Sequence, residues 1–235
     1  MSLKDEVVAL IESISAEEQA LFANLAEAER EAQGEPDRWS PKDAIAHLAA
    51  WKARLVRNLE ALALGESLVR YDDYEAINAR EFEVYRDASW PEILDTALTV
   101  NQRLVEQIEG TSEAQLEAAF RDERTVRQAI VLTAYTHPVN HLGRVYLDRG
   151  DVEHATHLQE EAAAKLGALD ASPSWQGTVR YNLACHYALI GETERAINGL
   201  REALELNPRL TEWSKEDPDF ECIREEPGYL ALYDE

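Results

Sequence analysis

The stretch Trp39-Ser-Pro-Lys-Asp-Ala-Ile-Ala-His-Leu-Ala-Ala-Trp51 begins a helix and places His47 on it. Its serine suits the N-cap, its proline suits the first turn, and Asp43 favours the positive end of the helix dipole. The helix is predicted to continue to about Leu64, because Gly65 follows as a terminator. Apolar residues recur at spacings of three and four, at Leu48, Trp51, Leu55, Leu59 and Leu62. The stretch therefore predicts a long amphipathic helix with His47 beside its apolar face.

Further helices are predicted on both sides of this one. Upstream, Ser15-Ala-Glu-Glu18 has the sequence of a capping box, so a helix is expected from there to Gln33, with Gly34 ending it. A shorter helical segment is expected before it, over roughly 3–13. Downstream, helices are predicted over 71–87, 90–110 and 125–149. Four long amphipathic helices joined by connections predict an all-α fold built on a four-helix bundle.

The last of these helices carries two more histidines, ninety positions after His47. Its predicted inward stripe consists of Ile130, Ala134, His137, His141 and Val145. Residues four apart on a helix lie about 6 Å from each other on one face, near enough to share an ion. Neutral imidazole is the commonest protein ligand for transition metals, and three imidazoles leave an open coordination position. His47, His137 and His141 are therefore the candidate metal ligands, against the alternative of three core histidines bonded to backbone or carboxylate.

Pro138 lies between the two histidines of this pair. A proline removes one N–H from the helical ladder and crowds the carbonyl four residues earlier, which belongs to Ala134. We therefore expect a kink or a break near Thr136. The sequence leaves open whether that distortion aims the two imidazoles or spoils their spacing.

The composition excludes several classes of protein. The chain has 235 residues and a formal net charge of −23, without a basic stripe, which disfavours binding to nucleic acid or to an anionic membrane. No apolar run approaches the roughly 20 residues of a membrane span, and no secretory signal is recognised at the start. Cys185 and Cys222 show no ligand-type spacing. A cytoplasmic protein with reduced thiols is the simplest interpretation.

The C-terminal part contains a repeat-like pattern. Seven spacings fit those of a tetratricopeptide repeat, at Leu183-Ala184, Tyr187, Gly191, Ala196, Leu200, Ala203 and Pro208. Small residues at these positions let two helices of a hairpin approach closely, and the proline ends the unit. The large aromatic residue expected near the start of the first helix is replaced by Arg180. Residues 211–235, including Trp213, Phe220 and Tyr229, are expected to cap the last apolar face.

A weaker copy of the pattern lies upstream, at Leu142-Gly143, Tyr146, Gly150, Ala155 and Ala162. Its first residues also belong to the helix that carries the histidine pair. The overlap supports the hypothesis that this helix also opens the repeat region, which would dock the two parts rigidly. The predicted domains are a bundle over 1–150 and a repeat region with its cap over 151–235.

The segment from Trp39 to Trp51, the region of Asn78, and the pair His137 and His141 together resemble the DinB-like (DfsB-type) four-helix bundle family. The resemblance covers roughly residues 1–150. It implies a divalent metal, commonly zinc or nickel, held by one histidine on the second helix and two on the fourth. The matching positions are His47, His137 and His141. Characterised relatives include transferases and isomerases that depend on a low-molecular-weight thiol, and hydrolases of reactive small molecules.

Two functions follow as hypotheses. The first is a metal-dependent enzyme that acts on a small electrophilic substrate by thiol transfer or hydrolysis; the sequence assigns no catalytic side chain. The second is a non-enzymatic interaction module, in which the repeat region binds a protein partner. A weaker variant has this region mediating self-association as a homodimer.

Other residues are weaker candidates. Asp43 is interpreted as a cap of its own helix rather than as a partner of His47. Trp51, Tyr74 and Asn78 are candidates to line a pocket beside the metal, although Trp51 is interpreted as core because it continues the apolar stripe. In the repeat region, His154 and His157 are expected to be solvated, His186 has no assigned role, and Cys185 is expected to serve packing.

Overall fold

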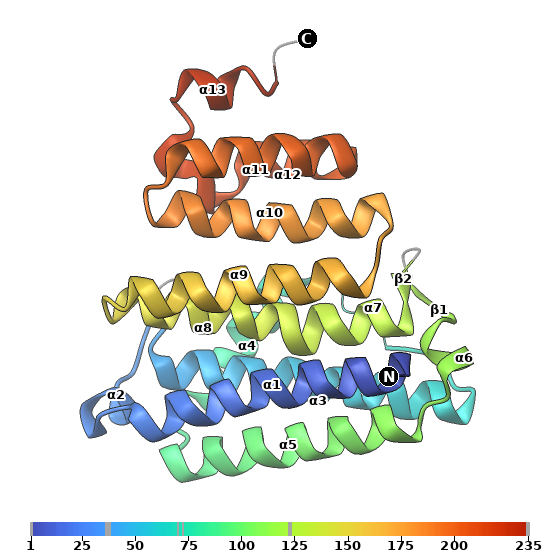
Figure 1. Ribbon diagram of the computed structural model, residues 1–235. Coiled ribbons are helices and arrows are strands. Elements are labelled where there is room, and N and C mark those ends of the chain that lie inside the picture. The colour runs from blue at the N-terminus through green and yellow to red at the C-terminus, as the bar shows by residue number, and fades with distance from the viewer. Residues whose placement is uncertain (1, 36–38, 70, 72, 122–123, 234–235) are drawn as a thin grey trace. The chain divides into compact units, whose positions relative to one another are not determined.

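The computed structural model describes residues 2–35, 39–69, 71, 73–121 and 124–233. The fold is all-α, with a single short hairpin of strands among these residues (Figure 1). The chain divides into two compact units, residues 1–142 and 143–235. None of the described helices is both long enough and apolar enough to cross a membrane.

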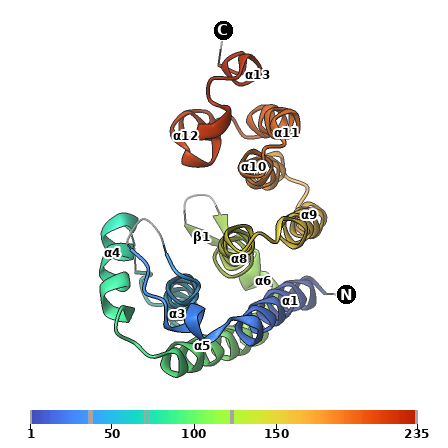
Figure 2. The ribbon, with the colours of Figure 1, turned by 90° about the vertical axis from the view of Figure 1, so that its left-hand side faces the viewer.

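The first unit is a four-helix bundle. Its helices are α1 (Leu3–Asn24), α3 (Pro41–Leu64), α5 (Trp90–Gly110) and a composite fourth helix made of α7 (Val126–Val131), η1 (Leu132–Thr136) and α8 (His137–Asp148). Helix α5 packs against α1 and α3, and the fourth helix contacts α1 and α3 in turn, so the four close a ring around a shared core. Figure 2 views these helices nearly end-on. The predicted bounds of α3 and α5 are confirmed. A serine caps the N-terminus of each helix, and a glycine lies at its C-terminal end.

Short elements connect the long helices. They are α2 (Glu27–Glu31), α4 (Tyr74–Tyr85), α6 (Glu113–Leu116) and the antiparallel strands β1 (Ala119–Arg121) and β2 (Arg124–Thr125). Helix α4 lies within the predicted segment 71–87, of which residue 72 is outside the described residues, and it packs on α3. The hairpin was not predicted from the sequence.

The predicted helix from Ser15 to Gln33 is wrong at both ends, because the first long helix ends at Asn24 and the separate short helix α2 follows it. Helix α1 runs without interruption from Leu3 to Asn24, and its N-terminal capping box is formed by Ser2 and Asp5. The apolar stripe explains the continuity, since buried residues recur at helical spacing across Ser15, at Val7, Leu10, Ile11, Ile14, Leu21 and Phe22. The Ser15 hydroxyl instead accepts a hydrogen bond from Asn101 of α5, at 3.2 Å.

The fourth helix is distorted where the sequence predicts it, but it does not break. Residues Leu132–Thr136 form a π-helical turn between α7 and α8, and the N–H of His137 bonds to the carbonyl of Leu132. A π-turn shifts the ladder from i→i−4 to i→i−5, which accommodates the missing N–H and the bulk of Pro138. The expected break near Thr136 is therefore a local change of helical pitch.

A buried ion pair crosses the interior of the bundle. Lys52 of α3 donates to Glu18 of α1 at 2.5 Å and to Asn101 of α5 at 2.9 Å. Asn101 also donates to the other carboxylate oxygen of Glu18, at 2.8 Å. Lys52 and Glu18 are only 2% and 3% exposed, so their charges are matched within the core rather than by water. The network ties three of the four bundle helices together.

The second unit is built from helical hairpins. Its elements are the end of α8, then α9 (Val152–Leu169), α10 (Pro173–Leu189), α11 (Thr193–Leu206), η2 (Pro208–Leu210), α12 (Thr211–Glu216), η3 (Pro218–Ile223) and α13 (Pro227–Leu230). Helix α10 packs against α9, α11 and η3. Gly150 and Gly191 adopt φ of 79° at the turns before α9 and α11, a conformation that glycine adopts without strain.

The C-terminal segment covers the apolar face of this unit only in part as predicted. Phe220 and Tyr229 are buried in its core, at 0% and 2% exposure. Trp213 is 60% exposed, so the expectation that it helps to cover the apolar face is wrong. Its indole N–H donates to the buried Asp217 at 3.0 Å, while the rest of the side chain is largely exposed.

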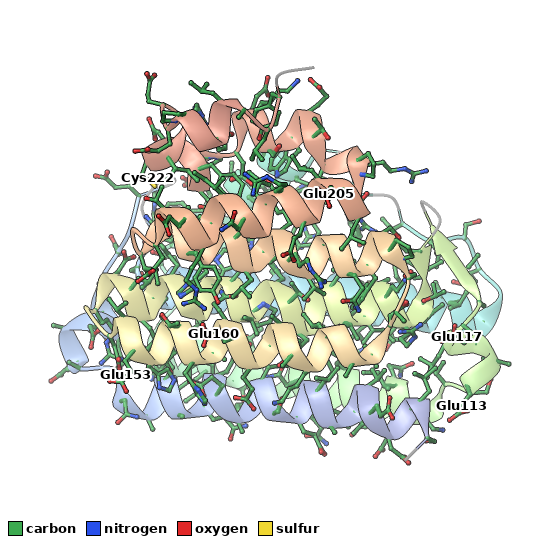
Figure 3. The ribbon with its side chains drawn as sticks, turned by 45° about the horizontal axis from the view of Figure 1, so that its top comes forward. Glu113, Glu117, Glu153, Glu160, Glu205 and Cys222 are labelled. Atoms are coloured by element: carbon green, nitrogen blue, oxygen red, sulfur yellow. The ribbon has the colours of Figure 1, made fainter. Side chains whose placement is uncertain are left out.

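The acid excess lies on the surface of both units. Figure 3 labels Glu113 and Glu117 on and after α6, Glu153 and Glu160 on α9, and Glu205 on α11, all of them exposed. Glu160 accepts hydrogen bonds from Tyr187 and Arg195 of the same unit. Solvation and such local pairing make the large negative charge compatible with a stable fold.

Candidate metal centre

Helix α3 places His47 inside the bundle, and the start of this helix is held rigidly. The Ser40 hydroxyl accepts from the backbone N–H of Asp43, and the Asp43 carboxylate accepts from the backbone and hydroxyl of Ser40 at 2.9 and 2.6 Å. The same carboxylate accepts from the N–H of Gly34 at 2.9 Å. Asp43 is thus a cap, as interpreted from the sequence, and His47 follows one turn later with 6% exposure.

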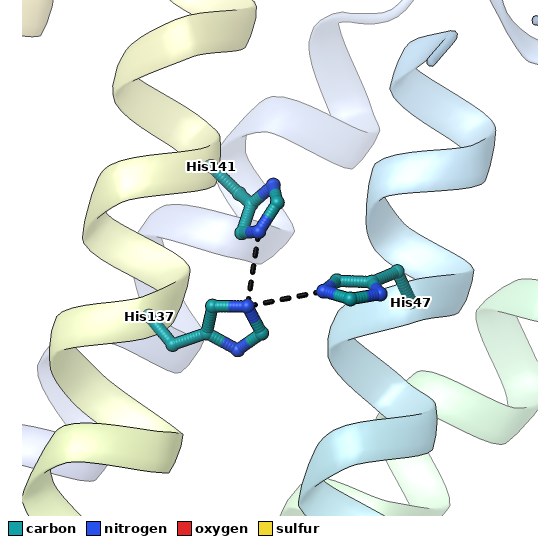
Figure 4. Close-up of side chains that lie close together, drawn as sticks. All are labelled: His47, His137 and His141. Atoms are coloured by element: carbon teal, nitrogen blue, oxygen red, sulfur yellow. Dashed lines mark hydrogen bonds between the residues drawn. The ribbon is translucent and has the colours of Figure 1, made fainter. Parts of the chain in front are cut away.

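Helix α8 brings His137 and His141 to the same point. The Nε2 atom of His137 lies 3.0 Å from Nε2 of His47 and 3.0 Å from Nε2 of His141 (Figure 4). Figure 4 shows the two rings of α8 facing the ring of α3 across the bundle interior. The structure therefore brings together the three histidines singled out in the sequence, and the π-turn before Pro138 leaves the spacing of the pair intact.

Hydrogen bonding alone does not satisfy this arrangement. A neutral imidazole nitrogen either carries one proton or offers one lone pair. Nε2 of His137 can therefore make one well-aligned hydrogen bond, yet it has two ring nitrogens at 3.0 Å. A cation at the centre would accept all three lone pairs, and metal–nitrogen bonds of about 2.1 Å place neighbouring ligand nitrogens roughly 3 Å apart. The donor set fits a divalent transition metal.

The electrostatic surroundings keep the imidazoles neutral. Burial lowers the pKa of His47 to about 2, with smaller effects from His141 and Arg54. Burial likewise lowers the pKa of His141 to about 4 and holds that of His137 well below its usual value. Neutral imidazole is the form that binds a metal, so all three rings are ready as ligands at neutral pH.

Aromatic rings surround the cluster. Trp39 stacks on His141 with centroids 5.6 Å apart, and it lies 4.3 Å from the ring of His47. Trp51 meets the edges of His47 and His137. Nδ1 of His47 is buried and finds no hydrogen-bond partner among the described residues. The orientation of the His47 ring is therefore supported by its contacts with Trp39 and Trp51 rather than by a hydrogen bond at Nδ1.

A cavity of about 430 Å³ opens beside the three histidines. Trp51 lines it and donates from its indole N–H to Asn78 of α4 at 3.0 Å, so Trp51 takes the pocket position rather than the core position that was preferred for it. Tyr74 and Asn78 line the cavity as the sequence suggested. Arg54 is a lining residue that the sequence analysis missed, although its position seven residues after His47 places it on the same face of α3.

The remaining candidates of the sequence lie in the second unit. His157 is exposed, His154 packs on Tyr146 with centroids 4.2 Å apart, and His186 is buried with its Nε2 3.0 Å from the Thr156 hydroxyl. The expectation of a solvated His154 is thus only partly correct. Cys185 is buried in the core, as expected, and approaches Asp217 and Asp219. Tyr181 and Trp213 donate to Asp217, so this acidic group has partners within the protein.

Fold and site together define a class: a helical bundle with three neutral imidazoles converging from its second and fourth long helices beside an open cavity. A family model for the DinB superfamily matches residues 5–145, and the chain belongs to this superfamily. Proteins of the superfamily are typically metal-binding, in agreement with the donor set found here. No curated protein matches the chain, and no solved structure matches it either.

Proposed function

We propose that this protein is a metal-dependent enzyme of the DfsB type, in which His47, His137 and His141 hold one divalent ion. Zinc and nickel are the candidate metals, because both accept neutral imidazole nitrogens. The observation that carries the proposal is the convergence of three Nε2 atoms whose separations hydrogen bonding cannot satisfy. The absence of a carboxylate or thiolate from this trio leaves the charge of the ion available to a ligand.

The proposed reaction is thiol transfer to, or hydrolysis of, a small electrophilic molecule. When bound, the metal supplies a Lewis acid that polarises a carbonyl and favours the deprotonated form of a thiol or water. The protein's own contribution is positioning. Trp39 and Trp51 pack on the histidine rings, and the adjoining cavity of about 430 Å³ suits a small substrate together with a low-molecular-weight thiol.

Elemental analysis of the untagged protein tests the metal assignment. We expect about one zinc or nickel ion per chain, and a large loss of metal in His137→Ala because one of three ligands is removed. His157→Ala is the matched control, since His157 is exposed and lies in the second unit. Equal metal content in the wild type and His137→Ala would refute the assignment.

Consumption of an electrophile tests the reaction. With a low-molecular-weight thiol present, the metal-loaded protein should accelerate loss of an epoxide or activated aryl halide, and chelation should abolish the effect. Product analysis separates the two chemistries, because transfer yields a thioether, whereas hydrolysis yields a diol from the epoxide or a phenol from the aryl halide; the aryl halide releases halide and a proton in both cases. Acceleration that survives complete removal of metal would contradict the proposal.

We also propose that the second unit contains one tetratricopeptide-like hairpin, formed by α10 and α11. The small residues at its crossing support this. A Cβ on Gly177 would lie 2.9 Å from the carbonyl oxygen of Ala203, and one on Gly199 would lie 3.3 Å from the Cβ of Ala184. Such close helix approach is what the repeat pattern requires. The upstream copy and the domain boundary at residue 150 stay predictions.

A further inference from the structure

The cavity beside the three histidines differs in charge from the rest of the molecule. About one residue in five of the chain is acidic, yet none of the described residues that line the cavity is an aspartate or glutamate. Arg54 and Arg124 are its permanently charged lining residues. A lining with two arginines and no carboxylate favours anions over cations, in contrast to the acidic surface of the rest of the molecule.

Arg54 is held with its guanidinium partly free. Its side chain is 15% exposed and pairs with Glu81 of α4. The planar head lies over the rings of Trp51 and Tyr71, at 5.3 and 5.2 Å from their centroids. Arg54 donates from Nη1 to Glu81 and to the Ala50 carbonyl, and among the described residues its Nη2 has no hydrogen-bond partner. A guanidinium group with one unpaired NH2 group can still bind an oxyanion.

The positions on α3 set the dimensions of the bound molecule. His47, Trp51 and Arg54 follow one another along one helical face, so the backbone positions of His47 and Arg54 are roughly 10 Å apart. Between them, Trp51 and Tyr74 form an aromatic wall with ring centroids 5.5 Å apart. The wall suits a flat apolar body, with the histidines at one end and the guanidinium at the other.

We propose that the cavity binds a small organic anion with a flat apolar body, whose carboxylate or phosphate group contacts Arg54 while its reactive end lies at the three histidines. This rests on the proposed function, since it names the substrate class of the same site. Arg124 adds positive charge to the wall. In this arrangement Glu81 competes with the ligand for the guanidinium.

Titration calorimetry on the full-length protein tests the proposal with three probes: benzoate, phenyl phosphate and neutral benzamide. Benzoate or phenyl phosphate should bind at least about 10-fold more tightly than benzamide, because a charge-assisted hydrogen bond is worth that factor or more. The comparison of the two anions identifies the preferred oxyanion group. Equal affinity for benzoate, phenyl phosphate and benzamide, or no binding by either anion, overturns the proposal.

Variants of Arg54 and Glu81 distinguish anion binding by Arg54 from a purely structural role of this ion pair in the cavity wall. Arg54→Gln should weaken binding of the preferred anion roughly 10- to 100-fold. Glu81→Gln should tighten it, since the competing carboxylate is gone; a purely structural ion pair predicts the opposite. The double variant Arg54→Gln with Glu81→Gln leaves neither charge of the pair unpaired, and it should also bind the anion weakly. If its helical circular dichroism matches that of the wild type, unfolding does not explain this weak binding.

Arg103→Gln is the matched control, because Arg103 pairs with Glu60 at 2.6 Å, is 52% exposed and is not among the residues that line the cavity. It should bind the anion as the wild type does. Titrations before and after chelation distinguish this proposal from the metal proposal. Binding that depends on Arg54 in metal-free protein upholds the anion site even if the protein holds no metal. Binding that is lost on chelation and indifferent to Arg54→Gln overturns it.

Discussion

At the scale of single residues, the burial of polar groups determines how the stability of this bundle responds to mutation and to pH. Lys52 and Glu18 are charged groups inside the core, whereas His47 is a buried neutral group and His137 and His141 are half-buried neutral groups beside it. A buried charge is tolerated only with a matched partner, whereas a buried imidazole avoids the cost by losing its proton. The two clusters therefore respond differently to mutation and to pH.

Removing one partner of the buried ion pair should be costly. In Lys52→Met the Glu18 carboxylate keeps its bond from Asn101 but loses its cation, so the free energy of unfolding should fall by about 3–5 kcal/mol. Urea denaturation measures this. The exposed pair of Arg103 and Glu60 supplies the comparison, where Arg103→Gln should cost about 1 kcal/mol or less. A similar small cost for both variants would contradict the argument.

The histidine cluster should make the metal-free protein sensitive to mild acid. The pKa values of His47 and His141 lie at about 2 and about 4 in the folded protein, below the usual value of 6.5. The unfolded chain therefore binds more protons between pH 6.5 and 4, so stability is full above pH 6.5 and falls as the pH drops through this window.

The slope should be reduced in His141→Leu, by up to about 1.4 kcal/mol per pH unit, because one such proton uptake is removed. His157→Ala should keep the wild-type slope, since this side chain is exposed. Chemical denaturation of chelator-treated proteins from pH 7 to 4 gives the comparison. Parallel curves for wild type and His141→Leu would show that His141 is not buried neutral in the fold.

At the scale of elements, two helices bring the metal ligands together, and each is fixed by local chemistry. Helix α3 starts at a capping box that also bonds Gly34, and the fourth helix passes Pro138 through a π-turn. The sequence predicts the first feature from Ser40, Pro41 and Asp43. The second was anticipated only as a distortion, because a proline shows where the ladder fails but not how the backbone adapts.

The cap of α3 should matter for both stability and metal binding. Asp43→Ala removes a carboxylate that accepts from Ser40 and Gly34, so we expect a loss of about 1–2 kcal/mol in the free energy of unfolding. Metal affinity should also fall, because His47 is one turn away. Ser2→Ala, at the exposed cap of α1, is the control and should leave metal affinity unchanged. Thermal melts with metal titration distinguish the two effects.

At the scale of the whole molecule, the chain folds into two compact units. The three histidines, the cavity and the buried ion pair all lie in residues 1–142. Residues 143–235 have their own apolar core around α10 and α11. A change in the packing of the second unit should therefore act on stability without removing any metal ligand.

Gly177→Ala tests this separation. A Cβ at Gly177 would lie 2.6 Å from the Cβ of Asn207 and 2.9 Å from the Ala203 carbonyl, so α10 and α11 must move apart, at a cost of about 1–3 kcal/mol. Gly167→Ala in α9 is the control, since its nearest neighbour is at 3.7 Å. Calorimetry should show destabilisation only in the first variant, with metal content unchanged in both. Loss of metal in Gly177→Ala would contradict independent units.

The sequence by itself determined the helices, their main caps and the three histidines on apolar faces, because these follow from local spacing and local hydrogen bonds. The predicted helix start at Ser15 was wrong, because the apolar stripe of α1 continues through this capping-box sequence and the helix continues with it. Only the tertiary structure decided that three ring nitrogens meet and that Arg54 faces their cavity. It also decided that Lys52 lies between Glu18 and Asn101. Contacts between distant helices depend on the packing of the complete core, which no local pattern encodes.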